Sequence, residues 1–243
     1  MVIKKDSIEK DRLKEVRRFL KLDFSKSSDF QDIVDLAALL CEKPVALITI
    51  LDEDVNWIKV RSGVEYEVMP RETSFCQYGI QQDEILIIPD ATKDYRFDDN
   101  PLVQSNPHVR FYAGAPLILN NGLKLGTLCL FDLKPNKITP LQEKTLSILS
   151  RQVTYLMELK LGQALLKKQL EETEAKNKAL RKIAFMQSHD IRHPLSSIMC
   201  LVNLVKDGIH PVDEHWLGMI TEATDTLDNK IKAIVNETAA DRS

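Results

Sequence analysis

The chain has 243 residues, of which 44% are hydrophobic and 28% are charged, and its formal net charge is −3. This length suits one ordinary domain with additional helices, and the small net charge gives no general attraction to nucleic acid or to anionic lipid. The longest apolar run, 45–51, is too short to cross a membrane, and the charged N-terminus lacks the apolar core of a secretory signal. We therefore expect no membrane insertion.

The four cysteines, Cys41, Cys76, Cys129 and Cys200, are widely separated along the chain. They show neither a CxxC pair nor the spacing of metal ligands, so the sequence predicts no metal site. Reduced thiols are typical of the cytoplasm, which is the location we expect.

The first part of the chain combines helical and strand patterns. Apolar residues at helical spacing predict a helix over about 8–20, and Ser28 or Asp29 is suited to cap a second helix over about 30–40. The run Pro44–Leu51 is rich in residues that favour strands. Further strands are expected at Asn56–Val60, 85–88, Phe111–Leu119 and Leu125–Leu133.

The loop lengths pair these strands into two hairpins, one closed by an acidic turn and one by Asn120-Asn121-Gly122. Helices come first, then an antiparallel sheet interrupted by long loops, and then another helix. This order predicts an α+β fold rather than a doubly wound one.

Several strings in this region follow the order of a GAF domain: PVALITILDEDVNWIKVRSG, PRETSFCQYGI, PDATKDYRFDDNPLV and VRFYAGAPL. The resemblance extends over nearly all of residues 10–155. It implies a module that senses a small molecule or another signal, with a pocket between the sheet and the long loops 65–80 and 90–110. Candidate lining residues are Trp57, Phe75, Cys76, Asp94, Arg96, Phe97, Phe111 and Tyr112.

These candidates also have simpler structural roles. Large aromatic side chains such as Trp57 and Phe111 commonly pack a core. Asp94 and Arg96 are placed to tie down their own loop through turn bonds and an ion pair. We give the structural role more weight for these four.

The cofactor is left unknown, because the sequence shows no bilin, haem or cyclic-nucleotide signature. Bilin-binding GAF domains usually carry a histidine after the attachment cysteine, whereas Gln77 follows Cys76 here and Leu130 follows Cys129. The only histidine in this part, His108, lies in a polar loop and is better explained as a surface residue than as a haem ligand.

A redox role is an alternative of a different class. Cys76 on a pocket loop and Cys129 on a strand are candidates for a nucleophilic and a resolving thiol, as in enzymes that resemble free methionine sulfoxide reductase. The cysteine pattern does not match that enzyme, and buried free cysteines often behave simply as small hydrophobic residues.

A long helix is predicted after the sheet. Residues 139–142 (TPLQ) form a capping box with proline at the first helical position, and one helix is expected from about 140 to 207, with Gly162 or Asn177 as places where it could break. Its apolar residues follow a heptad seam with polar interruptions, which is typical of a coiled coil. A plain spacer helix is the alternative.

The run Ser188–Leu195 (SHDIRHPL) carries the strongest chemical signal. His189 lies off the apolar seam of its helix and is expected to face solvent. Asp190 is placed to orient the imidazole and to act as a general base, so that the other ring nitrogen can attack phosphorus. Pro194 removes one helical N–H and crowds the Asp190 carbonyl, so the helix is expected to break or bend there.

Arg192 and His193 follow on the same helical face as His189 and are candidates to steady an incoming phosphoryl group. This string resembles the H-box of sensor histidine kinases. The resemblance implies a helical hairpin that pairs with a second copy into a dimeric four-helix bundle. Asp213 is a suitable N-cap for the second helix, which carries its own apolar stripe.

The sequence lacks the asparagine-rich box and glycine-rich lid of the kinase ATP-binding domain, so autonomous kinase activity is not expected. We expect a homodimeric phosphorelay protein, phosphorylated in trans by a donor histidine kinase and recognised by the receiver domain of a response regulator. The alternative is a non-catalytic regulator that binds complete histidine kinases. The predicted domains are a GAF sensor (1–155), a coiled-coil linker (156–178) and a phosphoacceptor hairpin (179–243).

Overall fold

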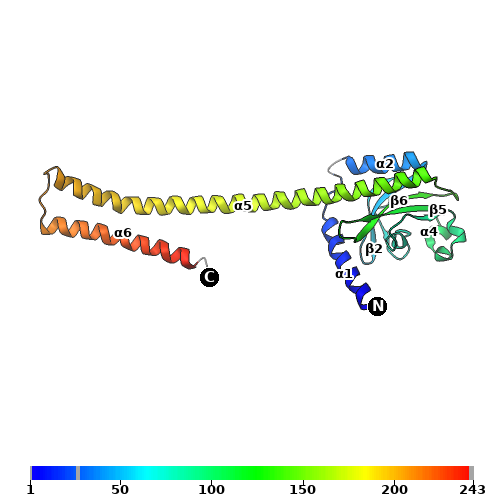
Figure 1. Ribbon diagram of the computed structural model, residues 1–243, viewed down its shortest axis with the longest axis horizontal. Coiled ribbons are helices and arrows are strands. Elements are labelled where there is room, and N and C mark those ends of the chain that lie inside the picture. The colour runs from blue at the N-terminus through cyan, green and yellow to red at the C-terminus, as the bar shows by residue number, and fades with distance from the viewer. Residues whose placement is uncertain (1, 26–27, 241–243) are drawn as a thin grey trace. The chain divides into compact units, whose positions relative to one another are not determined.

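The computed structural model describes residues 2–25 and 28–240. The chain divides into two compact units, Met1–Leu165 and Leu166–Ser243, and each is described by itself (Figure 1). Helix α5 (Pro140–Lys206) begins in the first unit and ends in the second. No described helix is both long enough and apolar enough to cross a membrane.

The described part of the first unit contains a six-stranded antiparallel sheet in the order β3-β2-β1-β6-β5-β4. Its central strands are rich in Val, Ile and Leu and are almost entirely buried, as expected when both faces are covered. The strands are β1 (Val45–Leu51), β2 (Val55–Ser62), β3 (Val68–Pro70), β4 (Leu86–Ile88), β5 (Phe111–Ile118) and β6 (Lys124–Asp132).

Helices cover one face of this sheet, which we call the helix face. Helix α1 (Val2–Phe19), α2 (Asp29–Cys41) and the first turns of α5 bury their apolar sides there (Figure 1). Val16 of α1, Val34 of α2 and Val153 of α5 belong to one hydrophobic cluster, together with side chains of β1, β5 and β6.

Long connections cover the opposite face, which we call the loop face. They contain the short helices α3 (Cys76–Gly79) and α4 (Pro101–Gln104) and two 3-10 helices, η1 (Ala91–Lys93) and η2 (Tyr95–Phe97). Their apolar side chains form a second hydrophobic cluster with the sheet.

The structure confirms the predicted α+β fold with an antiparallel sheet and long helices. Each predicted strand is present, with bounds that differ by only a few residues. Helix α2 begins at Asp29 as expected, although the Ser28 side chain makes no capping hydrogen bond. Strand β3 and helices α3 and α4 were not predicted, because these short elements have neither helical periodicity nor, in contrast to β4, a run of strand-forming residues.

The capping box at the start of α5 is confirmed. The Gln142 backbone N–H donates to Thr139 Oγ1 at 3.2 Å, and the Thr139 N–H donates to Gln142 Oε1 at 3.0 Å. The single helix expected from about 140 to 207 is confirmed, since α5 continues through Gly162 and Asn177, whereas the helix does not break at Pro194 as expected. Proline removes a single helical hydrogen bond, and the bonds of the neighbouring turns hold the helix together here.

The second unit is an antiparallel helical hairpin formed by the end of α5 and by α6 (Glu214–Ala240) (Figure 1). Gly208 closes the first helix with a φ of +70°, a conformation that glycine adopts without strain. Asp213 Oδ1 then accepts the Trp216 N–H at 2.8 Å and caps α6. The Trp216 indole donates to the Leu201 carbonyl at 3.0 Å and joins the two helices.

Candidate functional site

A group of polar side chains lies inside the apolar core on the loop face. Thr49 on β1 is opposite Thr127 on β6, and their hydroxyl oxygens lie 3.2 Å apart. Because strand side chains alternate between faces, Cys129 points the same way as Thr127. We call this group the central polar cluster; its buried members are Thr49, Asn56, Ser74, Cys76, Tyr112, Thr127 and Cys129.

Helix α3 lies directly on the sheet above this cluster. A Cβ atom at Gly79 would be 3.0 Å from Thr127 Cγ2, so glycine permits the close approach. Ser74 Oγ accepts the Cys76 N–H at 3.1 Å and fixes the start of α3. This arrangement brings Cys76 Sγ to 3.7 Å from Cys129 Sγ, and Cys129 lies 3.7 Å from the Leu47 carbonyl oxygen.

The cluster separates the acidities of its two thiols. Burial by itself raises the pKa of Cys76, but hydrogen bonds from Cys129 and nearby hydroxyl groups stabilise its thiolate and lower the pKa below the ordinary value. Burial and the neighbouring Cys76 raise the pKa of Cys129. Burial also raises the pKa of Tyr112, whose hydroxyl has no hydrogen-bond partner within the described residues.

Four of the predicted lining residues, Phe75, Cys76, Phe97 and Tyr112, come together beside this cluster. Phe75 and Cys76 begin α3, and Tyr112 reaches them from β5. The Phe75 ring stacks on Phe97 at 4.1 Å between centroids and on Tyr112 at 5.3 Å. These rings fill the centre of the loop face, so the aromatic side chains of the set pack mainly against one another.

Phe111 and Trp57 lie elsewhere, which corrects their predicted grouping. Phe111 is buried in the hydrophobic cluster of the helix face, because consecutive strand residues point to opposite sides and Tyr112 takes the loop face. Trp57 is 36% exposed on β2. The predicted set therefore does not line one cavity, and ligand binding by this unit stays a prediction.

Asp94 and Arg96 pair with each other, as the structural explanation of these residues expects. Asp94 Oδ1 accepts the Arg96 backbone N–H at 3.1 Å and the Arg96 Nε–H at 2.9 Å. The Arg96 hydrogen bonds lower the pKa of the Asp94 carboxyl group. The Arg96 guanidinium group also lies 5.4 Å from the centroid of the Tyr78 ring. This pair ties η2 to its own loop.

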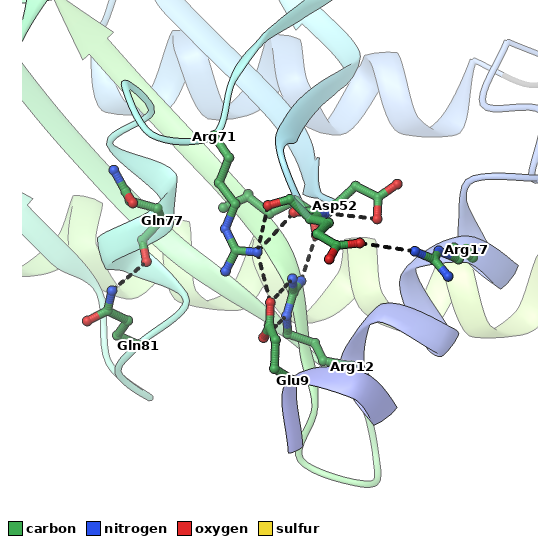
Figure 2. A network of polar contacts seen from close by, with 9 residues as sticks. Glu9, Arg12, Arg17, Asp52, Arg71, Gln77 and Gln81 are labelled. Atoms are coloured by element: carbon green, nitrogen blue, oxygen red, sulfur yellow. Dashed lines mark hydrogen bonds and ion pairs between the residues drawn. The ribbon is translucent and has the colours of Figure 1, made fainter. Parts of the chain in front are cut away.

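A second polar network, which the sequence gave no reason to expect, joins α1 to the sheet edge. Figure 2 shows Glu9 between Arg12 and Arg71. The Arg12 side chain is buried and donates to the Leu51 carbonyl oxygen at 2.6 Å and to Glu9 Oε2 at 2.7 Å. Arg71 donates to Glu9 Oε1 at 2.8 Å and to the Asp52 carbonyl oxygen at 3.0 Å. These bonds lower the pKa of Glu9 to about 2.

His189 lies on the outside of the hairpin, and its side chain is 72% exposed. Its Nδ1 atom is 4.0 Å from Asp190 Oδ1, beyond hydrogen-bonding distance. Asp190 is closer to Lys230 on α6, at 3.6 Å, a neighbour that sequence spacing could not reveal. Arg192 and His193 are exposed, whereas Pro194 is buried.

The GAF domain model matches residues 27–156, which is just over half of the chain. A cyclic di-GMP phosphodiesterase of Pseudomonas aeruginosa is 42% identical over 120 residues, which are 49% of this chain and 20% of that protein. The chain thus spans about a fifth of the length of this curated relative.

Solved structures that are similar to this chain include the following three. The GAF domain of Thermosynechococcus elongatus PixJ has a TM-score of 0.47 and 16% identity, covering 60% of this chain and 90% of that one. An Acinetobacter phosphoenolpyruvate-protein phosphotransferase GAF domain has a TM-score of 0.44, 18% identity and coverages of 60% and 92%. Free methionine-R-sulfoxide reductase of Neisseria meningitidis has a TM-score of 0.45, 16% identity and coverages of 58% and 84%. On the match to the family model, the chain belongs to the GAF domain family.

Proposed function

We propose that this protein is a signalling protein in which the GAF domain controls a phosphoacceptor hairpin. His189 accepts a phosphoryl group from a donor histidine kinase in trans, and the receiver domain of a response regulator takes it up. The observation that carries this proposal is an exposed His189 within SHDIRHPL on a helix that is antiparallel to a second helix. A phosphoacceptor must be accessible to both its phosphate donor and its phosphate acceptor, and the exposed side chain of His189 meets this requirement.

The chemistry requires a nucleophilic imidazole nitrogen beside a group that holds the other ring N–H. Asp190 fills this role after a small side-chain movement, since its carboxylate is 4.0 Å from His189 Nδ1. Lys230, Arg192 and His193 place cationic or hydrogen-bonding groups near the same part of the hairpin. Such groups balance the negative charge of an incoming phosphoryl group.

Exposed apolar side chains support a homodimer. Along α5 and α6 they include Leu166, Leu170, Leu180, Leu195, Met199, Val202, Leu217 and Ile231, each more than 40% exposed. Exposed apolar side chains that recur along a helix are typical of a surface that a partner helix covers. In the proposal, a second copy of the chain covers it, so that two hairpins form a four-helix bundle.

Helix α5 supplies the route from sensor to hairpin. Its first turns are anchored in the core of the GAF domain through Leu146, Val153 and Met157, and the same helix carries His189. A signal that shifts these turns changes the packing of the helix further along, provided that two packings are close in free energy. The similarity to the cyclic di-GMP phosphodiesterase concerns a fifth of that protein, and we propose that the shared part has a sensory role.

The non-catalytic regulator is the second candidate. It is favoured by the ion pair of Asp190 with Lys230, because the His189 ring N–H does not donate the expected hydrogen bond to Asp190. In that case the hairpin binds complete histidine kinases through its apolar surface, and His189 is dispensable.

The test is an assay of acid-labile phosphate after incubation with labelled ATP, alone and with a soluble extract of the source organism. His189→Gln is compared with His215→Gln, the same change at an exposed histidine of α6 that has no part in the proposed site. Label that requires the extract and is lost only in His189→Gln supports the proposal. Label from ATP alone contradicts a donor in trans. An unlabelled protein, in an extract that labels its own histidine kinases, favours the regulator.

A further inference from the structure

The two thiols of the central polar cluster meet in the interior of the GAF domain. Cys76 Sγ lies 3.7 Å from Cys129 Sγ, although the residues are 53 positions apart in the chain. A disulfide requires about 2.05 Å between the sulfur atoms. The two atoms would therefore have to approach by roughly 1.7 Å, a shift that side-chain rotation and a small movement of α3 can supply.

The surroundings of these thiols differ from those of ordinary buried cysteines, which usually sit among apolar groups. Here the hydroxyl groups of Thr49 and Thr127 and the unpartnered Tyr112 hydroxyl are part of the same buried cluster. The lowered pKa of Cys76 and the raised pKa of Cys129 provide one thiolate and one thiol. This division of roles suits a nucleophilic and a resolving cysteine.

We propose that Cys76 and Cys129 form a redox-modification site, in which a hydroperoxide converts the two thiols into an intramolecular disulfide. The Cys76 thiolate attacks one oxygen of hydrogen peroxide, the O–O bond breaks, and Cys76 becomes a sulfenic acid. The leaving hydroxide takes up from solvent the proton that Cys76 released on ionisation, and the first water forms. The Cys129 thiol then attacks the Cys76 sulfur, its proton goes to the departing hydroxide, and a second water forms. Two thiols are oxidised and one peroxide is reduced to two waters.

Access to the buried pair is through the loop face. Both thiols are buried, so a peroxide reaches them only when the loop face opens locally around α3, a helix of four residues. Hydrogen peroxide is little larger than water and needs no permanent channel.

The bond would tie α3 to the centre of the sheet. Cys129 is on β6, and the neighbouring Leu128 and Leu130 belong to the helix-face cluster that contains Leu146 and Val153 of α5. The first turns of α5 therefore pack against β6, and a movement of β6 is passed on to them. The site serves as an input for the signalling role proposed above, and the disulfide chemistry itself does not depend on phosphorylation of His189.

The other two cysteines provide internal controls. Cys41 is buried on the helix face, where its thiol lies 3.8 Å from the Gln142 carbonyl oxygen. Cys200 is exposed on the hairpin and would join separate chains on oxidation, so the experiment uses the full chain with Cys200→Ser. Cys41 then stays as a thiol that should not react.

This variant is treated with hydrogen peroxide, denatured in the presence of an alkylating reagent, and analysed by intact mass and peptide mapping. We expect the number of alkylated thiols to fall from three to one. Before alkylation, the oxidised protein should be lighter than the reduced protein by two hydrogen atoms. The peptide map should contain one disulfide-linked peptide pair, with Cys76 and Cys129. Dithiothreitol should restore all three thiols. Adding Cys41→Ala should leave the linked peptide unchanged, and adding Cys129→Ala should leave Cys76 as a sulfenic acid that dimedone traps.

The proposal is overturned if all three thiols persist at a peroxide dose that oxidises Cys200 in the wild-type chain. A linked peptide that contains Cys41 would overturn it as well. If the Cys129→Ala variant does not fold, the peptide map of the Cys200→Ser protein decides the question alone. This experiment measures thiol oxidation and not phosphorylation, so failure of the phosphotransfer assay would leave its result unaffected.

Discussion

Glu9 Oε1 accepts a hydrogen bond from Arg71 at 2.8 Å, and this contact joins the N-terminal helix to the residue that directly follows β3 (Figure 2). Arg12 completes the network through Glu9 and through the Leu51 carbonyl oxygen. The buried guanidinium group of Arg12 would be costly without these partners, since an unpaired buried charge is strongly unfavourable. Glu9 is therefore the carboxylate that makes this docking of α1 possible.

Glu9→Gln should lower the free energy of unfolding of the first unit at pH 7. The pKa of Glu9 falls from its ordinary value of 4.5 to about 2 because of its hydrogen bonds with Arg12 and Arg71. A depressed carboxyl pKa contributes stability above pH 4.5 that is lost as the pH falls toward 2. The Glu9 side chain is 38% exposed, so solvent screening reduces the expected loss to about 1 kcal/mol.

Urea unfolding at a series of pH values measures this effect. The difference between wild type and Glu9→Gln should be constant above pH 4.5, shrink as the pH falls toward 2, and vanish only below pH 2, where the Glu9 carboxyl group becomes protonated in the folded state too. Asp11→Asn is the matched control, because Asp11 forms only an exposed pair with Lys14 on the same helix. An equal effect of both substitutions would mean that the network adds no stability.

Gly126→Ala should disrupt the sheet, whereas Gly162→Ala should be tolerated. A Cβ atom at Gly126 would lie 1.8 Å from the Thr49 carbonyl oxygen of the adjacent strand. Gly162 lies in α5 with open space around it, where alanine favours the helix by about 1 kcal/mol. We expect Gly126→Ala to cost more than about 3 kcal/mol in unfolding free energy. Thermal unfolding of both variants checks this, and a stable Gly126→Ala protein would contradict the close approach of β1 and β6.

Much of the fold could be predicted from the sequence because its main elements are long and regular. The runs that became β1, β5 and β6 combine strand-forming residues with clear turn signals, and Thr139 and Gln142 mark the start of α5 with a reciprocal cap. Short elements such as β3 and α3 were missed, since their conformation depends on tertiary contacts rather than on a repeating pattern.

The candidate sites were predicted less completely, because they depend on residues distant in sequence. Phe111 and Tyr112 were grouped together, although neighbouring residues in a strand cannot both face the same side. Cys76 and Cys129 were considered together, but only the packing of α3 on β6 determines their separation. Lys230 could not have been assigned to Asp190, since the register of two antiparallel helices is set by their packing.

Placing two acidic residues on the seam of α5, with Leu166→Glu and Leu170→Glu, should convert the proposed dimer into a monomer. These side chains are 67% and 57% exposed in the single chain, and a charge buried between two helices is unfavourable. Size-exclusion chromatography with light scattering measures the mass. Ala175→Glu adds the same type of charge on the opposite side of the heptad and should leave the dimer intact. A wild-type chain that is monomeric at high concentration would refute the homodimer.

Pro194→Ala should stabilise the hairpin, because α5 is helical on both sides of this residue. Alanine restores an N–H for the Asp190 carbonyl oxygen and removes the steric conflict of the proline ring with it, a gain of up to about 3 kcal/mol. The two tryptophans allow a local measurement, since Trp57 is in the GAF domain and Trp216 is in the hairpin. In a Trp57→Phe background, Trp216 fluorescence during urea unfolding reports on the hairpin alone. Ser196→Ala is the control and should change stability by less than about 0.5 kcal/mol. A loss of stability in Pro194→Ala would mean that contacts of the buried ring outweigh the regained hydrogen bond.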